Sequence, residues 1–331
     1  MSNATSAKKN VLLICGGGGT EHEVSLVSAK YIEENLHKME GVESYFVEIC
    51  KDGNRRTKDG SLCELRKDGE LCIGEKKIKL DFAIPCIHGI PGETGELPAL
   101  FEMMRLPYLG NGPEASVLCF NKISTKLWLN ALGVPNTPYI FLNSLEDLPR
   151  AKKAMAEWKH VFVKAASQGS SVGCYSVKGE EELTLALRKA FKYSPYVLIE
   201  KAISGRELEV STYEYEGKIV ATYPGEIICQ PGSFYSYNEK YGADGHTKTA
   251  TRAENISSDI SEKIRNYALD AFVGLKLRHL SRIDFFLSNN GEIFLNEINT
   301  FPGMTPISMF PKMMEEYGHS FEKFLKDIIF A

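Results

Sequence analysis

Residues 280–300, LSRIDFFLSNNGEIFLNEINT, carry the strongest structural signal in this sequence. Hydrophobic and polar residues alternate through 281–287 and again through 293–299, the period of a half-buried strand. Asn290 and Gly291 separate the two runs, and Asn-Gly is the dipeptide most typical of a two-residue hairpin turn. The stretch therefore predicts an antiparallel β-hairpin.

The hairpin also predicts a group of polar side chains on one face. A two-residue turn places Asp284 opposite Glu297 and Arg282 opposite Asn299. Opposed carboxylates repel each other at this spacing, unless a cation lies between them. Oxygen ligands of this kind suit Mg²⁺, which usually shares them with phosphate.

The alternative is a solvated hairpin whose acidic side chains point into water. We consider it less favourable because the other face would be apolar. Its expected members are Phe285, Leu287, Phe294 and Ile298.

Composition excludes several classes of protein. The 331 residues are 43% hydrophobic and 25% charged, as in ordinary globular chains, and predict two or three domains. The net charge of −4 argues against a nucleic-acid partner. No apolar run is long enough to span a membrane. The eight cysteines lack the close spacing of zinc ligands, so we expect reduced thiols and a cytoplasmic protein.

The order of expected elements predicts an α/β fold, α+β in parts. Strands alternate with helices near the N-terminus, which favours a parallel sheet with functional residues at the carboxyl ends of its strands. We expect residues 1–9 to be disordered. Gly110-Asn111-Gly112-Pro113 predicts a domain boundary, and a polar, glycine-rich stretch runs over about 230–251.

Two segments predict nucleotide contacts. The strand 161–165 delivers Lys164, and a Gly/Ser loop follows it, whose backbone N–H groups can surround phosphate oxygens. The apolar strand ending in Glu200 and Lys201, with Glu207 a turn later, suits adenine and ribose. The first segment, considered alone, is also explained by an ordinary exposed turn. Charges exposed to solvent explain the second segment as well as a nucleoside site does.

The glycine run near the N-terminus resembles a dinucleotide loop but lacks one feature of it. Position 21, where the third glycine of such a loop would stand, is Glu21. A carboxylate there suits a bound ammonium group, and simple helix capping is an equal alternative.

These segments in this order resemble the D-alanine–D-alanine ligases of the ATP-grasp superfamily, over residues 10–328. The resemblance rests on the following motifs: Glu21-His22-Glu23-Val24-Ser25, His88-Gly89, Gly92-Glu93-Thr94-Gly95, Gly169-Ser170-Ser171-Val172-Gly173, Glu239-Lys240-Tyr241, Arg282-Ile283-Asp284, Asn296-Glu297-Ile298-Asn299-Thr300 and Pro302-Gly303-Met304-Thr305. It implies the three-domain ATP-grasp fold, with a parallel α/β domain over 10–112, a small α+β domain over 113–203 and a C-terminal α+β domain over 204–331 that carries a lid of about 230–251. It also implies the joining of two D-alanines through an acyl phosphate. The product serves peptidoglycan precursor synthesis.

The resemblance also implies a role for each matching residue. Those expected to bind ATP are Lys122, Lys164, Ser170, Ser171, Glu200, Lys201, Ile203, Glu207 and Lys240. Two Mg²⁺ ions, with Mn²⁺ as an alternative, would be bound by Asp284, Glu297 and Asn299. Substrate binding would fall to Glu21, His88, Arg282, Ser308 and the Met309 backbone. Those implied in catalysis are Glu21, Ser170, Tyr241, Arg282 and the Gly303 N–H.

Tyr241 bears on the product, because relatives that make D-alanyl-D-lactate carry other residues at this lid position. Tyrosine here resembles the dipeptide formers, with D-serine open as a second substrate. Ala165 and Ala253 stand where relatives usually have proline, and residues 242–247 match no lid closely. The resemblance also suggests a homodimer.

Other functions stay open at this point. The nearest is a related carboxylate–amine ligase with D-serine or D-lactate as second substrate. A catalytically silent nucleotide-binding regulator would be expected to lose one of the metal or phosphate residues, and none is lost. A dehydrogenase is the weakest alternative.

Overall fold

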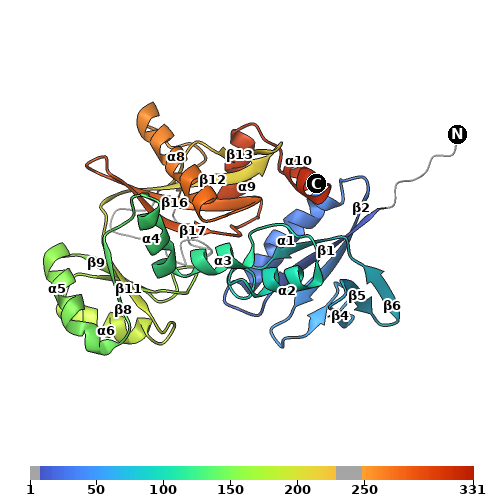
Figure 1. Cartoon of the computed structure of the whole chain (residues 1–331), viewed down its shortest axis with the longest axis horizontal. Coiled ribbons are helices and arrows are strands. Elements are labelled where there is room, and N and C mark those ends of the chain that lie inside the picture. The colour runs from blue at the N-terminus through green and yellow to red at the C-terminus, as the bar shows by residue number, and fades with distance from the viewer. Residues whose placement is uncertain (1–7, 229–247) are drawn as a thin grey trace.

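The computed structural model describes residues 8–228 and 248–331, and it is a mixed α/β structure. Figure 1 shows the N-terminal part (blue) at one end, the central part (green) at the other, and the C-terminal part (orange and red) beside both. No helix in the two described ranges is both long and apolar enough to cross a membrane.

The N-terminal sheet is parallel at its centre, as expected from the alternation of strands and helices. Its strand order is β3-β2-β1-β7, with β1 parallel to both neighbours. These strands and their helices are β1 (Lys9–Gly16), α1 (His22–Leu36), β2 (Val42–Ile49), β3 (Arg55–Arg56), β7 (Phe82–Cys86) and α2 (Glu96–Met104). A small antiparallel sheet, which the sequence analysis did not anticipate, lies between β3 and β7. It consists of β4 (Cys63–Leu65), β5 (Glu70–Ile73) and β6 (Lys76–Lys79).

Two helices lead from this part to the central sheet. That sheet has the antiparallel order β10-β9-β11-β8, with two helices packed on its apolar face. The elements are α3 (Pro113–Phe120), α4 (Lys122–Ala131), β8 (Tyr139–Leu142), η1 (Leu145–Asp147), α5 (Leu148–Trp158), β9 (Val161–Ala165), β10 (Cys174–Val177), α6 (Glu180–Ala190) and β11 (Val197–Lys201). Val161 and Val163 on β9 are fully buried, whereas Lys164 between Val163 and Ala165 is only partly buried. The period of two thus leaves Lys164 on the face away from α5 and α6.

The C-terminal part contains the largest sheet. Its order is β15-β14-β12-β16-β17, and β13 pairs with β12. The elements are β12 (Gly205–Tyr215), β13 (Lys218–Ala221), β14 (Gly225–Ile228), β15 (Lys248–Ala250), α8 (Ser258–Gly274), β16 (Leu280–Ser288), β17 (Ile293–Asn299), α9 (Met309–Glu316) and α10 (Phe321–Ile329). The aromatic residues of α9 and α10 share one hydrophobic core with β1 and α1, and Tyr31 stacks on Phe321 with ring centroids 5.5 Å apart. The C-terminal helices therefore join the N-terminal sheet to the large sheet (Figure 1).

The predicted hairpin is present, and its polar pairing is confirmed. The pairing results from a longer turn and a bulge, and not from the two-residue turn that was assumed. Asp284 lies opposite Glu297, and Arg282 lies opposite Asn299. The turn is one residue longer than predicted, however, because Ser288 exchanges backbone hydrogen bonds with Gly291 and Glu292. A β-bulge at Asn296 restores the register between Asp284 and Phe285.

This bulge makes one expectation wrong. Phe294 is only partly buried and faces the same side as Phe286, its partner across the hairpin. The buried face of the hairpin consists of Phe285, Leu287, Ile293, Leu295 and Ile298.

Two expected segment boundaries also need correction. Lys9 already belongs to β1, so the expected disordered segment 1–9 overlaps a strand by one residue. Residues 229–247 of the expected lid lie outside the described residues, but Lys248–Ala250 forms β15 and pairs with β14. The domain boundaries near 112 and 203 remain predictions.

Candidate active site

Two adjoining cavities lie between the sheets. The first, of about 540 Å³, is enclosed by the polar face of the central sheet and the face of the large sheet opposite it. The second, of about 870 Å³, lies between the N-terminal part and the segment that follows β17. Lys122, Gln168, Glu209 and Glu297 line both cavities, which therefore meet along the hairpin.

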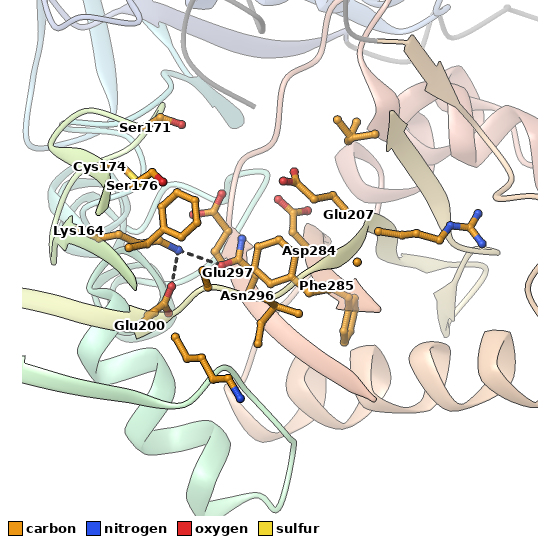
Figure 2. Close-up of a pocket in the computed structure, with 18 of the residues that line it drawn as sticks. Lys164, Ser171, Cys174, Ser176, Glu200, Glu207, Asp284, Phe285, Asn296 and Glu297 are labelled. Carbon is orange, nitrogen blue, oxygen red and sulfur yellow. Dashed lines mark hydrogen bonds and ion pairs between the residues drawn. The ribbon is translucent and has the colours of Figure 1, made fainter. Parts of the chain in front are cut away.

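The first cavity gathers most residues predicted to bind a nucleotide. Its lining includes Lys122, Lys164, Ser171, Glu200, Lys201, Ile203, Glu207, Asp284 and Glu297. Figure 2 shows Lys164 and Glu200 approaching from the central sheet, and Glu207 and Asp284 from the large sheet. Segments separated by more than a hundred residues thus form its two walls.

Lys164 is held from two sides in this cavity. Its Nζ lies 2.5 Å from Glu200 Oε2 and donates a 3.2 Å hydrogen bond to Asn296 Oδ1 (Figure 2). Burial acts to lower the pKa of Lys164, but Glu200, together with Cys174 and Glu297, outweighs it, so the pKa is raised. The lysine therefore stays charged inside the cavity.

The carboxylate of Glu200 has more interaction partners than the sequence indicated. Its Oε1 lies 2.6 Å from Nζ of the buried Lys126 and accepts a 2.9 Å hydrogen bond from Thr137. Burial acts to raise the pKa of Glu200, but the charges of Lys126 and Lys164 lower it to about 2. The carboxylate of Glu200 already binds these partners. The backbone of β11 at Glu200, and not the side chain, is therefore suited to contact an adenine base.

The Gly/Ser loop after β9 has an unusual backbone. Ser170 and Ser171 have φ angles of 50° and 60°, in the left-handed region that side chains other than glycine rarely adopt. Strained residues of this kind gather at ligand sites. Lys122 donates a 2.7 Å hydrogen bond to the Gln168 carbonyl at the start of the loop, and it lies 3.6 Å from Glu297.

Arg282 is held by carboxylates on its own sheet. It donates two 2.8 Å hydrogen bonds to Asp284, and its Nε lies 3.3 Å from Glu209. Asn299 donates a 3.0 Å hydrogen bond to the same Asp284 carboxylate. Burial opposes the charge of Arg282, but Asp284 and Glu209 raise its pKa well above the usual value. Arg282 therefore presents a permanent charge to the second cavity, which it lines.

The chemistry of this hairpin face fits a hard divalent cation. Asp284, Glu297 and Asn299 offer carboxylate and amide oxygens, the donors that Mg²⁺ prefers. Among the described residues, no group of three or more His, Cys, Asp or Glu side chains is arranged to hold an ion. A metal site here would therefore need the amide oxygen of Asn299 as a ligand. It would also need Asp284 to give up its hydrogen bonds from Arg282 and bind the ion instead.

The second cavity is lined by all the residues predicted to bind substrate, Glu21, His88, Arg282, Ser308 and Met309, and by Ser170 and Gly303, which were predicted to act in catalysis. Glu21 precedes α1 but makes no capping hydrogen bond with its side chain, which rules out the capping alternative. Its carboxylate instead accepts a hydrogen bond from Ser170 Oγ. Gly303 passes so close to Ser308 that a Cβ on it would lie 2.9 Å from Ser308 Oγ.

His88 lies at the wall of this cavity with both ring nitrogens engaged. Nδ1 lies 3.1 Å from the Phe301 carbonyl, which can only accept, so Nδ1 carries a proton. Burial lowers the pKa of His88, although Glu21 opposes this, so the ring is neutral and Nε2 accepts from Ser28 Oγ at 2.9 Å. Ser28 in turn accepts from the Met304 N–H. His88 therefore fixes the backbone around Gly303.

Glu93 was part of a motif but received no role from the sequence. Its two carboxylate oxygens accept hydrogen bonds from the N–H groups of Gly89 and Phe301, at 2.8 and 3.2 Å. Burial and the charge of Glu21 raise the pKa of Glu93 to about 7. Lys126 and Glu209 were also missed, because no local pattern distinguishes a buried charge from an exposed one. Lys240 and Tyr241 lie outside the described residues.

Comparison with families of known proteins covers almost the whole chain. The model described as D-ala D-ala ligase N-terminus matches residues 10–111, and the model described as D-ala D-ala ligase C-terminus matches residues 128–330. A D-alanine--D-alanine ligase of Shewanella baltica is 52% identical over 328 residues, which are 98% of this chain and 97% of the relative. One of Shewanella frigidimarina is 51% identical over 97% of each chain.

The comparison with solved structures also covers almost the whole chain. A D-alanyl-alanine synthetase A from Vibrio cholerae superposes with a TM-score of 0.93 at 50% identity, over 98% of each chain. The VanG D-Ala:D-Ser ligase from Enterococcus faecalis superposes with a TM-score of 0.87 at 26% identity, over 97% of this chain and 98% of that one.

Proposed function

This chain belongs to the D-alanine–D-alanine ligase family, and from that premise we propose that it joins two D-alanines at the expense of ATP. The observation that carries the proposal is the meeting of the two cavities along β16 and β17. Asp284 lines the first cavity, Arg282 and Asn299 line the second, and Glu297 lines both. A nucleotide in the first cavity would thus direct its terminal phosphate at a carboxylate held in the second.

In the first step, a carboxylate oxygen of one D-alanine attacks the γ-phosphorus of ATP. An acyl phosphate forms, and the bond to ADP breaks. Lys122 and Lys164 hold the phosphate oxygens, and Arg282 stabilises the charge on the transferring group. Mg²⁺, bound by Asp284, Glu297 and Asn299, would supply further neutralisation of phosphate charge. Glu21, oriented by Ser170, binds the ammonium group of this first substrate.

In the second step, the deprotonated amine of another D-alanine attacks the acyl carbon. The tetrahedral intermediate carries an oxyanion, which Arg282 and the Gly303 N–H stabilise. Collapse expels phosphate and leaves the dipeptide. Ser308 and the Met309 backbone hold the second carboxylate. Both steps need a dry site, because water hydrolyses acyl phosphates. In the proposed lid, Lys240 would contact the γ-phosphate, and Tyr241 would reach Glu21 and Ser170 and so close the site.

The remaining roles concern the nucleoside. The backbone near Glu200, Lys201 and Ile203 would contact adenine, and the Glu207 carboxylate would accept hydrogen bonds from ribose. Ser170 and Ser171 would contribute loop contacts to phosphate. Except for Ser170, which lines the second cavity, these residues line the first cavity, and this supports the assignments.

The proposal is tested by measuring phosphate release from ATP in the presence of Mg²⁺. D-Alanine, L-alanine, D-serine with D-alanine and D-lactate with D-alanine are offered in turn, and products are identified by mass. We expect release with D-alanine alone and a product of two alanines. Equal release with L-alanine would remove the stereochemical assignment.

A second candidate product is D-alanyl-D-serine. The structural likeness to the VanG D-Ala:D-Ser ligase supports this alternative. The serine assay above separates the two, since the products differ in mass by one oxygen. We further propose a homodimer in the cytoplasm that supplies peptidoglycan precursors, and sedimentation of the purified protein tests the dimer.

A further inference from the structure

Lys126 is a fully buried lysine that no part of the proposed mechanism uses. It lies on α4, and its side chain is 1% exposed. Its ammonium contacts Glu200 Oε1 at 2.6 Å and Thr137 Oγ1 at 2.5 Å, and lies 5.3 Å from the centre of the Tyr139 ring. It does not line the first cavity, so it cannot contact a ligand there directly.

Lys126, Glu200 and Lys164 form an unbalanced cluster of charges beside the first cavity. Glu200 lies between two lysines, with Lys126 behind it and Lys164 in front, 2.5 Å away. Two ammonium groups and one carboxylate leave a net charge of one positive unit. Burying a charge is costly unless it is paired. Glu200 thus has two charged partners besides its hydrogen bond from Thr137, and of the two lysines only Lys164 reaches the cavity.

We propose that Lys126 is a positioning residue for nucleotide phosphates: it neutralises Glu200 and so leaves the charge of Lys164 to the phosphate chain. The inference rests on the proposed function in one respect, that the first cavity takes ATP. Without Lys126, Lys164 and Glu200 form a neutral pair. The site then loses attraction for phosphate while its shape for the nucleoside is unchanged.

The dependence on ligand charge distinguishes this role from simple packing. Removing one unit of charge near the phosphates is expected to weaken ATP binding about tenfold. Adenosine carries no phosphate, so its affinity stays within roughly twofold. ADP falls between the two. A purely structural role would instead weaken all three ligands alike.

The test is a calorimetric titration of the whole protein with ATP, ADP and adenosine. Lys126→Met removes the charge with little change in length, and Lys126→Arg retains it. Lys152→Met is the matched control, because Lys152 makes its 2.6 Å ion pair with Glu180 at the surface of the same part of the chain. We expect a loss of ATP affinity in Lys126→Met, partial rescue in Lys126→Arg and wild-type affinities in Lys152→Met.

The double variant Lys126→Met/Glu200→Gln covers the case in which Lys126→Met does not fold. It removes both buried charges and leaves Lys164 positive, so the ratio of ATP to adenosine affinity should return close to the wild-type ratio. Equal loss of ATP and adenosine affinity in Lys126→Met, or a reduced ratio in the double variant, would overturn the inference. Because wild-type dipeptide synthesis is measured separately, either result leaves the proposed reaction untouched.

Discussion

Ser170 donates its hydroxyl hydrogen to Glu21, although 149 residues separate the two in the chain. The contact joins the strained loop after β9 to the turn before α1. It thereby connects the central part, which offers groups for phosphate, to the N-terminal part, which offers a carboxylate for an ammonium group. Glu21 has this orientation only when both parts are assembled.

Ser170→Ala is expected to lower kcat/KM for D-alanine by roughly tenfold to a hundredfold, since hydrogen bonds to charged groups contribute about 1.5–3 kcal/mol. The melting temperature should hardly change, because the loop lies at the cavity and not in a core. Steady-state kinetics and thermal unfolding check both statements. Ser258→Ala, at an exposed position in α8, is the control. Wild-type kinetics in Ser170→Ala would contradict the role of this contact.

Asp284→Asn is expected to reduce turnover by at least about a hundredfold, the scale of losing one charged group that acts on a developing charge. The fold should survive, because an amide can still accept from Arg282. Phosphate release and circular dichroism measure the two outcomes. Asp270→Asn on the exposed face of α8 provides the same chemical change elsewhere in the large-sheet part. A variant at position 284 with full turnover would remove the metal assignment.

The pKa of Glu200 predicts a loss of stability in acid. It is about 2 in the folded chain against an ordinary value of 4.5, so the ionised form stabilises the fold. That contribution, of the order of 3 kcal/mol, is fully present above about pH 4.5 and is lost as the pH falls towards 2. Denaturant unfolding between pH 2 and 6 should therefore show a shallower pH dependence in Glu200→Gln. Glu181→Gln, exposed on α6, should keep the wild-type slope.

The pKa of Glu93 predicts the opposite change of stability with pH. Its pKa is raised from 4.5 to about 7, so the folded chain favours the protonated carboxyl. The associated stability is complete below pH 4.5 and is lost as the pH rises through 7. The free energy of unfolding of the ligand-free protein should fall over this range, and Glu93→Gln should remove that fall. Glu96→Gln, exposed three residues later, is the comparison. An unchanged pH profile in Glu93→Gln would show that another group titrates.

The hairpin formed by β16 and β17 shows how much structure can be predicted from local sequence patterns. The pairing of Asp284 with Glu297 was predicted correctly, but the turn contains one more residue than assumed, and the bulge at Asn296 compensates. Alternation cannot reveal a bulge, because inserting one residue only shifts the faces of the residues on one side of it. That is why Phe294 was assigned to the wrong face.

The buried charges could not be predicted in the same way. Lys126 stands on a helix whose spacing is amphipathic, where a lysine is ordinarily exposed. Glu209 likewise alternates with apolar residues on β12 and reads as a solvated position. Lys126 is buried against Glu200 of β11 and Thr137, and Glu209 lies beside Arg282 on the neighbouring strand β16, so neither burial can be read from the local pattern.

The sequence by itself determined which chemical groups this protein has and in what order. Its motifs also indicated the family, and its period of two placed four polar residues on one face of β16 and β17. Only the tertiary structure decided which charged and polar groups meet: Glu200 with Lys126 and Lys164, Arg282 with Glu209, and Glu21 with Ser170. These pairings join separate elements, so they depend on how sheets and helices pack together, and no periodicity within one segment contains that information.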